Sequence, residues 1–539
     1  MLIDARTLPP DAELDCDVCV IGGGPAGITL ACRWIDKPFR VTLLESGGLT
    51  VRRRSQNLAR GANVGLPYLP LHLTRMRCLG GSTARWTGWC RPLDPIDFEA
   101  RDWIPDSGWP FGLEELATFY RGAHELCELG TYRYDAQSWS GAIGPELPVS
   151  TGPLRTRIFH HSPPTHFGVA YRGQLEEARN VTVYLNATLL GLLADEGGRI
   201  PSATAAVPGR GRLTVRSRIY VLAAGGIENA RILLLSGSGR GGLGNQRGLV
   251  GRYFMEHPIL FTGTFEPDPP NRDLTLYTFP PTRVEPPGLR GRIVAALSPS
   301  ADVLRRERIG NCAVHFMRRA SHKTMPDYFT AGVASLHELG GAARRLEAPD
   351  GTLRHLKSVF AEMGPAVRTA ARALRAAAPE GRYALKVYLE PVPNPSSRVE
   401  LSGDRDRFGQ PRARVSWRLT ESDRRTLRRL LEITSTEMER TGVGRVRIMG
   451  ADTDSGWPPT LSGGSHHMGV TRMHPDPGRG VVDPDCLVHG LSNLYAAGSS
   501  VFPTVGYANP TLTIIALALR LADHLEARIR SAPRISRAR

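Results

Sequence analysis

The sequence predicts an α/β protein, α+β overall, in which a Rossmann-like domain is interrupted by an inserted domain built on an antiparallel sheet. A short apolar strand at 17–21 runs into a glycine-rich loop, and a helix over 26–34 and a second strand over 40–45 follow. This order, over about thirty residues, is typical of one β-α-β unit. Further short strands are expected at 181–185 and 219–224.

The character of the chain changes between about residues 256 and 454. Pro-rich connections, alternating strand-like runs and one Ala/Arg-rich helical stretch at 366–378 indicate a separate domain there. After residue 465 the character of the first domain returns, and the chain ends in a long helix expected over 511–528. We therefore expect a discontinuous first domain and one insert, with the bounds 1–255 and 460–539 for the first and 256–459 for the second.

A chain of 539 residues is longer than one ordinary domain, so two or three domains are expected. Its hydrophobic residues, 41% of the chain, are sufficient to form the cores of these domains. A formal net charge of +16 raises the question of a nucleic acid or an anionic membrane as a partner. Nearly all of this charge is arginine, because lysine occurs only at positions 37, 323, 357 and 386, and no long basic block is present. Codon bias of a GC-rich genome explains this pattern at least as well, so the sequence predicts no nucleic-acid partner.

Eight scattered cysteines fit a reducing cytoplasm rather than a disulfide scaffold. Cys16 and Cys19 have C-x-x-C spacing inside a predicted strand, where their side chains point to opposite faces, so no metal site is expected. The first residues lack a signal pattern, and no apolar run approaches the ~20 residues of a membrane span. The sequence thus predicts a soluble cytoplasmic protein without an integral membrane segment.

The loop after the first strand contains Gly22, Gly24 and Gly27 in G-x-G-x-x-G spacing. The first glycine permits a tight turn, the second lets the backbone approach a pyrophosphate, and the third allows close helix–strand packing. Glu45 ends the second strand, where a carboxylate can accept hydrogen bonds from ribose hydroxyls. The unit predicts dinucleotide binding but does not separate NAD from FAD.

Seven further motifs follow the glycine loop along the chain. They are RCLGGST (77–83), AAGGIENAR (223–231), GRYFMEHP (251–258), PNPSSRV (393–399), SHHMGVTRM (465–473), GSSVFPT (498–504) and ANPTLT (508–513). Together with the loop they resemble the glucose–methanol–choline (GMC) oxidoreductases, a family of FAD-dependent alcohol oxidases and dehydrogenases. The resemblance covers the chain in order and leaves mainly 265–380 without a match. It implies an FAD-binding domain with an inserted substrate-binding domain.

The resemblance also implies a catalytic pair. Its H-x-x-G pattern falls on His466 and Gly469, which makes His466 the catalytic base, and the companion about forty residues later is Asn509. A neutral imidazole can take the proton of an alcohol, and Asn509 can hold the same oxygen. His467 is expected to point away from the flavin, because neighbours in an extended segment face opposite ways. His257 and His489 are expected to be structural.

FAD contacts are expected along the motifs, and the predicted set is Gly22, Gly24, Gly27, Glu45, Arg77, Gly80, Gly81, Ser82, Ala224, Gly225, Gly498, Ser499, Asn509, Pro510 and Thr511. Asn509 and Pro510 also have the form of a helix N-cap followed by a first-turn proline. Several relatives attach FAD covalently through a histidine just after the second glycine motif, and Arg85 stands at that place here. The FAD is therefore expected to be non-covalent.

The motifs around Gly80, Gly498 and Asn509 look most like the sugar-oxidising, pyranose-oxidase-like branch of the family. The substrate expected is an alcohol group of a sugar or glycoside, with aminoglycoside antibiotics and their biosynthesis as one specific version. A polycationic substrate would require acidic groups, for which Glu256, Glu362 and Glu390 are candidates. The electron acceptor, oxygen or another, stays open, and so does the oligomeric state, a homo-oligomer included.

Three rival functions remain. An electron-transferring dehydrogenase subunit could dock on a membrane cytochrome through Arg368, Arg372 and Arg375 of the 366–378 stretch, although a solvated arginine face is favoured. A redox-neutral flavin-containing lyase is the second, and flavin bleaching by substrate would separate it from an oxidase. A non-catalytic nucleotide-binding protein is the third, and His466 with Asn509 argues against it.

Overall fold

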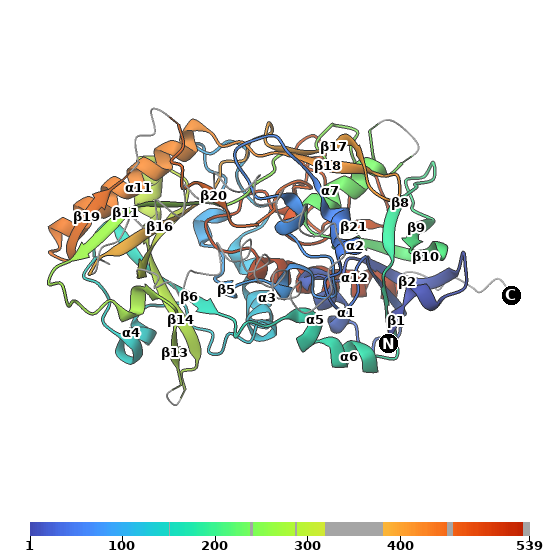
Figure 1. Cartoon of the computed structure of the whole chain (residues 1–539), viewed down its shortest axis with the longest axis horizontal. Coiled ribbons are helices and arrows are strands. Elements are labelled where there is room, and N and C mark those ends of the chain that lie inside the picture. Colours follow the sequence, from blue (N-terminus) through green and yellow to red (C-terminus); the bar gives the residue numbers. More distant parts are fainter. Residues whose placement is uncertain (150, 238–240, 286–287, 319–380, 450–455, 532–539) are drawn as a thin grey trace, which may run out of the picture.

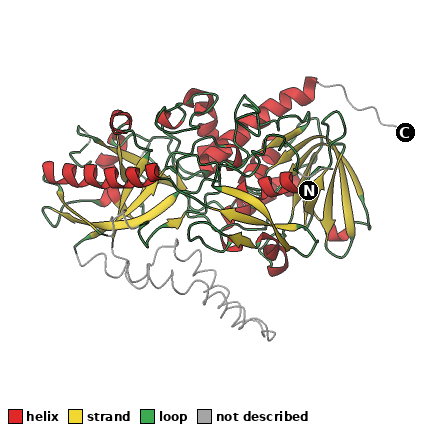
Figure 2. Cartoon of the chain, turned by 90° about the horizontal axis from the view of Figure 1, so that it is seen from above, coloured by secondary structure: helices red, strands yellow, loops and turns green. Residues whose placement is uncertain are grey.

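The computed structural model describes residues 1–149, 151–237, 241–285, 288–318, 381–449 and 456–531. The helical stretch predicted at 366–378, with its three arginines, and Glu362 lie outside these residues. Among the described helices, none combines the length and apolarity that crossing a bilayer requires. Figure 1 gives the arrangement of the elements, and Figure 2 shows two groups of strands at opposite ends of the molecule with helices over and between them.

The first sheet has eight strands and contains the predicted β-α-β unit. Its order is β1 (Leu2–Asp4), β7 (Val181–Leu185), β3 (Val41–Glu45), β2 (Glu13–Ile21), β10 (Gly211–Leu222), β9 (Ser202–Val207) and β8 (Thr188–Leu192), and β21 (Leu494–Ala496) also pairs with β10. The strands from β1 to β10 and β21 pair in parallel, whereas β8 and β9 are antiparallel additions. The Rossmann-like prediction is confirmed.

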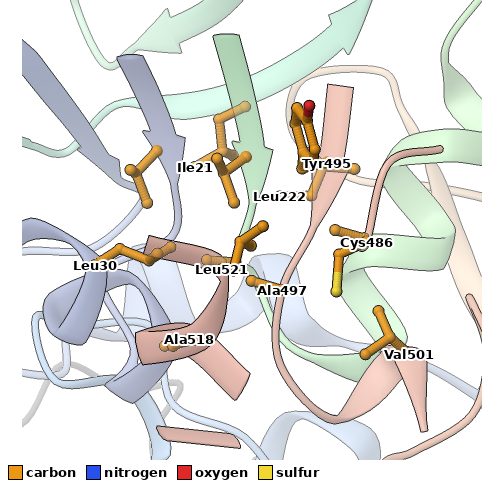
Figure 3. Packing of buried hydrophobic residues seen from close by; sticks show 14 of the residues in the cluster. Ile21, Leu30, Leu222, Cys486, Tyr495, Ala497, Val501, Ala518 and Leu521 are labelled. Carbon is orange, nitrogen blue, oxygen red and sulfur yellow. The ribbon is translucent and has the colours of Figure 1, made fainter. Parts of the chain in front are cut away.

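The strands next to the glycine loop are buried where they approach it, over residues 18–21 of β2 and all of β3, because both faces of this part of the sheet are covered. All five residues of β3 are buried, and α1 (Pro25–Arg33) packs between the sheet and the last helix, α12 (Thr511–Ser531). Figure 3 shows this core, in which Ile21 and Leu222 of neighbouring strands meet Leu30, Ala518 and Leu521 of the two helices. The glycine loop is therefore carried by a rigid scaffold.

The second sheet has ten strands and is largely antiparallel, as predicted. Its order is β19 (Gly444–Ile448), β11 (Pro258–Pro267), β16 (Tyr383–Leu389), β15 (Cys312–Arg318), β14 (Gly291–Pro299), β6 (Leu154–His161) and β5 (Trp89–Cys90), with β12 (Thr278–Phe279), β13 (Thr282–Val284) and β20 (Ser462–Gly463) attached to its sides.

Residues alternate between the two faces of this sheet, as strand geometry requires. Leu385, Val387 and Leu389 of β16 pack with leucines of α11 (Glu421–Arg440), which covers the outer face. Tyr388, from the other face of the same strand, packs with Trp89 of β5. This inner face is turned toward the first domain and forms one wall of the site described below.

A small third sheet joins β17 (Arg398–Arg405), β18 (Pro411–Ser416) and β4 (Gly61–Asn63). Val399 and Val415 belong to the core of the first domain, whereas β5 and β6, early in the chain, pair within the second sheet. Strand pairing thus crosses residues 255 and 460, and the domain bounds given above stay a prediction. Within the described residues, the remaining α-helices are α2 (Arg53–Gln56), α3 (Leu113–Leu126), α4 (Gln137–Ile143), α5 (Phe167–Ala170), α6 (Arg172–Glu177), α7 (Gly226–Leu235) and α8 (Ala301–Glu307).

Candidate active site

A cavity of about 1140 Å³ runs from the glycine loop of the first sheet to the inner face of the second sheet. Small-molecule sites commonly measure about 300–1,000 Å³, so this space is large enough for a cofactor and a substrate together. Gly22 and Glu45 line one end, and Trp89 of β5 and Phe261 of β11 line the other. The cavity joins the two predicted domains.

The glycines of the first loop differ in what surrounds them. Gly22 has φ +115°, and a Cβ there would lie 2.6 Å from the carbonyl oxygen of Ala223, so the tight turn requires glycine. A Cβ on Gly27 would lie 1.9 Å from the Gly22 oxygen, and Gly27 does not line the cavity. A Cβ on Gly24 would meet nothing within 4 Å, so the backbone stands bare at the cavity where a phosphate group would fit.

Glu45 lies buried at the end of β3. Its carboxylate accepts hydrogen bonds from the backbone N–H groups of Gly23, at 2.9 Å, and Gly47, at 2.7 Å. Burial raises the pKa of this carboxyl, although the two backbone donors oppose the shift. Oε1 also accepts from the Ser46 hydroxyl at 3.3 Å, whereas Oε2 keeps a second lone pair, which a ribose hydroxyl could use.

The other predicted contacts are distributed as follows. A Cβ on Gly80 would lie 2.6 Å from the backbone nitrogen of Gly168, so Gly80 supports the loop from behind and does not line the cavity. Gly225 and Gly498 resemble Gly24 in having open space where a Cβ would stand. The predicted residues that line the cavity are Gly22, Gly24, Glu45, Arg77, Gly81, Ser82, Ala224, Gly225, His466, Gly498, Ser499, Asn509, Pro510 and Thr511.

Arg77 belongs to a buried ion network that sequence reasoning missed. Glu228, in the first turn of α7, pairs with Arg75 at 3.0 Å, with Arg77 at 2.8 Å and with Arg231 at 2.7 Å. Arg231 also pairs with Asp406 at 2.8 Å. The three guanidinium groups hold the pKa of Glu228 well below its usual range despite burial. These ion pairs hold in place the cavity wall that is formed by the motifs at 77–83 and 223–231.

His466 is positioned through its backbone. Its N–H group donates to both oxygens of Glu256 at 2.9 Å, and the N–H of Gly464 donates to the same carboxylate at 2.9 Å. A Cβ on Gly464 would lie 2.7 Å from Nδ1 of His466, so only glycine leaves room for the ring. Met255 and Met468 exchange backbone hydrogen bonds at 3.0 Å, and stepping two residues along each strand brings His257 opposite His466.

The two histidine rings form one hydrogen-bonded line with Asn509. His257 contacts the carbonyl oxygen of Gly506 through Nε2 at 3.0 Å and Nδ1 of His466 through its own Nδ1 at 2.8 Å. Nε2 of His466 lies 3.3 Å from the amide nitrogen of Asn509. His257 is therefore not a separate structural histidine, and its position among distant residues is the reason that the sequence missed it.

This line of contacts sets the tautomers. A carbonyl only accepts, so Nε2 of His257 carries its proton, and a neutral His257 then accepts at Nδ1. Burial lowers the pKa of His257 to about 4 and that of His466 well below its usual value, which keeps both rings neutral near pH 7. Nδ1 of His466 must then be the donor, and its unprotonated Nε2 lies at the cavity, where it accepts from the amide nitrogen of Asn509 at 3.3 Å.

His467 points toward Tyr68 and also lines the cavity, so its orientation relative to the flavin stays a prediction. Its Nε2 lies 3.0 Å from the hydroxyl of Tyr68, which donates to Glu256. Its ring stacks on Phe254. Glu256 thus links the backbone of His466 with Tyr68 and His467, and neither Tyr68 nor this role of Glu256 was expected from the sequence.

Replacing Glu256 by glutamine should change the pH dependence of stability. Burial raises the pKa of Glu256 from 4.5 to about 7, so the folded protein binds this proton more tightly than the unfolded chain. The contribution of the protonated carboxyl to the free energy of unfolding is complete below pH 4.5 and is lost as the pH rises through about 7. Relative to Glu256→Gln, the wild type should therefore lose about 1.4 kcal/mol of unfolding free energy per pH unit between these values.

Denaturant unfolding of both proteins near pH 5 and near pH 7 measures this difference. If the difference between the unfolding free energies of the two proteins does not change with pH, the pKa of Glu256 is not raised in the folded protein.

Helix α12 begins at Thr511, and the Pro510 carbonyl accepts from the N–H of Ile514 at 2.8 Å. Pro510 thus occupies the position before the helix, and the predicted capping role of Asn509 is wrong by one residue. The side chain of Asn509 instead faces His466. The helix start still points at the cavity, which Pro510 and Thr511 line.

Comparison with known proteins supports a common origin for this arrangement. The model of the GMC oxidoreductase family matches residues 393–518, which include His466 and Asn509. The chain is 25% identical to paromamine 6'-oxidase of Streptomyces fradiae over 94% of this chain and 90% of that relative. It is 35% identical to C-glycoside 3-oxidase of Arthrobacter globiformis, over 24% of this chain and 23% of that relative.

A solved structure shows the same fold. Pyridoxine 4-oxidase from Mesorbium loti superposes with a TM-score of 0.55 at 19% identity, covering 95% of this chain and 99% of that one. The agreement extends over both sheets, beyond the segment that the family model matches. The chain thus resembles the flavin-dependent GMC oxidoreductase family in the sequence of residues 393–518, and a solved oxidase shares its fold over nearly the whole chain.

Proposed function

We propose that this enzyme oxidises an alcohol group on a sugar, glycoside or aminoglycoside-type substrate to a carbonyl, with His466 as the base. The observation that carries the proposal is the hydrogen-bonded line from Gly506 through His257 to His466, which leaves the lone pair of His466 Nε2 at the cavity. FAD, when bound, accepts the hydride that leaves the alcohol carbon. Residues of this chain take the proton and orient the alcohol.

His466 takes the hydroxyl proton at Nε2, and its Nδ1–H continues to donate to His257, which stabilises the imidazolium that forms. Asn509 stands beside Nε2, and its amide can donate to the alcohol oxygen and hold it there. His257 is fully buried and His466 is partly buried, so water has little access to the contact between the two rings, which strengthens that hydrogen bond. The arrangement supports alcohol oxidation.

The residues that would hold the cofactor fit a dinucleotide. Gly24, Gly225 and Gly498 present bare backbone to the cavity, and Glu45 stands where a ribose would lie. Arg85 occupies the position at which several members of the family carry a histidine that is covalently linked to FAD. Its guanidinium group lies 3.9 Å from the Met76 sulfur. Non-covalent binding by these residues is part of the proposal.

Acid precipitation tests non-covalent binding. We expect the yellow colour to stay in the supernatant after the precipitated protein is removed, because an arginine at position 85 cannot form the histidyl link. Flavin absorbance of the two fractions is the measurement. Colour that remains in the pellet after washing in denaturant would contradict this expectation.

Replacing His257 by phenylalanine should slow flavin reduction about tenfold, a fraction of what the base itself contributes. Without the acceptor at Nδ1, His466 is free to place its proton on Nε2, where it cannot act as a base. Anaerobic stopped-flow reduction with saturating substrate measures the effect. His257→Asn, which retains an acceptor, should lose less, and an equal loss in both variants would assign His257 a packing role only.

The substrate range follows from the relatives. Paromamine 6'-oxidase and 6'''-hydroxyparomomycin C oxidase are named for aminoglycoside substrates, and C-glycoside 3-oxidase is named for C-glycosides. Anaerobic flavin reduction against a panel of sugars, glycosides and aminoglycosides tests the proposal, and admission of air afterwards reports whether oxygen is the acceptor. Bleaching by none of these compounds would overturn it, and turnover without bleaching would favour a redox-neutral lyase.

A further inference from the structure

Lys386 is a buried lysine in the wall of the cavity. It lies on β16, where its backbone is paired with His315 of β15 on one side and Phe261 of β11 on the other. Its relative exposure is 1%, and it lines the same cavity as His466. Fully buried lysines are rare, because removing an ammonium group from water is costly. A lysine at this place therefore calls for an explanation.

Aromatic and neutral groups surround the ammonium group. Nζ lies 5.0 Å from the ring centre of Tyr388 and 5.9 Å from that of Trp89, within the range of cation–π attraction. His161 of β6 and His315 face the same region, and burial lowers the pKa of His161 to about 3 and that of His315 well below its usual value. Burial also lowers the pKa of Lys386, to about 7. Lys386 is thus a positive charge in this wall when it is protonated, and Arg292 also acts on His161.

In the described part of the chain, the carboxylates that could attract a cation are engaged elsewhere. Among the cavity-lining residues in the described ranges, the acidic ones are Glu45 and Glu228, which belong to the glycine-loop end and to the arginine network. Glu256, a candidate for an acidic pocket, is engaged by Tyr68 and by backbone N–H groups. Glu390 forms an ion pair with Arg101 at 2.6 Å.

We propose that Lys386 is a specificity-determining residue, which donates to a hydroxyl or carboxylate oxygen of the substrate and excludes substrates with an ammonium group at that position. The inference deepens the proposed function and rests on it. Like charges at a few ångströms repel strongly where water is excluded, whereas an oxygen acceptor satisfies the ammonium group. The part of the substrate that lies beside Lys386 is therefore neutral or anionic.

Three ligands that differ in one substituent test the proposal. They are a methyl glucoside, its 6-amino-6-deoxy analogue and the corresponding glucuronide. Each is titrated into the flavin-containing enzyme without oxygen at about pH 6, where Lys386 carries its proton, and the Kd is taken from the change in flavin absorbance. We expect the amino analogue to bind at least about tenfold more weakly than the other two.

Lys386→Met keeps the length of the side chain without its charge, and it should reduce this discrimination at least about threefold by improving the Kd of the amino analogue relative to the other ligands. Lys386→Gln is a second neutral variant in case the first does not retain flavin. Lys37, which pairs with Glu526 on the surface at 2.9 Å, provides the matched control, and Lys37→Met should leave all three Kd values unchanged.

The outcomes separate the two proposals. Equal Kd values in the wild type, preference for the amino analogue, or one common change of all three values in the Lys386 variants would overturn the role of Lys386 while leaving sugar oxidation standing. Absence of any spectral change with all three ligands, together with no bleaching by the substrate panel, would overturn the proposed function and this inference with it.

Discussion

Replacing His466 by alanine should leave the flavin bound but slow its reduction by an alcohol about 100-fold or more, the usual contribution of a general base. The imidazole is held by the carboxylate of Glu256 through its backbone and by His257 through its ring. Alanine keeps the backbone contact, so the loop stays in place, but no group remains at the cavity to take the hydroxyl proton at this position.

Single-turnover reduction in an anaerobic stopped-flow instrument measures this loss, with the flavin content of the purified variant determined first. His489→Ala is a matched control, because His489 contacts the carbonyl of His474 at 2.9 Å and does not line the cavity. The control should reduce its flavin at the wild-type rate. Equal rates in His466→Ala and the wild type would remove His466 from the mechanism.

Replacing Glu390 by alanine should lower the free energy of unfolding by about 3–5 kcal/mol. Its carboxylate receives both terminal nitrogens of Arg101, at 2.8 and 2.6 Å, and the N–H of Asn311 at 2.8 Å. The side chains of Glu390 and Arg101 are 0% and 1% exposed, so the variant leaves a guanidinium buried without its carboxylate.

Chemical unfolding followed by fluorescence and flavin release measures the loss. The exposed pair of Glu13 and Arg216, whose side chains are 56% and 50% exposed, is the comparison, and Glu13→Ala should leave the free energy of unfolding almost unchanged. Arg101→Met combined with Glu390→Leu should recover part of the stability, because an apolar pair avoids the unpaired charge. Equal losses of unfolding free energy for Glu390→Ala and Glu13→Ala would show that the buried ion pair contributes no more to stability than the exposed one.

Local sequence patterns located part of the first sheet, although β2 and β10 begin earlier than predicted and β1, β8, β9 and β21 were not predicted. Strand β7 has the predicted bounds, and α1 and β3 begin and end within one residue of the predictions. These predictions succeed because the period of apolar residues and the positions of glycines reflect backbone geometry within a few residues. The same local logic located the glycine loop, Glu45 and the helix after Asn509.

Sheet partners were less accessible to sequence reasoning. Strands β5 and β6 lie before residue 255 and look like parts of the first domain, yet they pair at the edge of the second sheet. The apolar pattern of a strand reports which face is buried but does not name the strand beside it. Pairing is decided by packing between segments far apart in the chain.

The sequence by itself determined the fold class, the dinucleotide loop and the expectation that His466 and Asn509 meet, since family motifs carry these features residue by residue. Only the tertiary structure decided which groups surround His466. His257 is 209 positions away from it in the chain, and Tyr68 is 188 positions away from Glu256. Lys386 lies in β16, and the sequence of this strand does not indicate that its side chain lines the cavity. Hydrogen bonds and burial depend on distances in space, and those distances arise only when the two sheets close around one cavity.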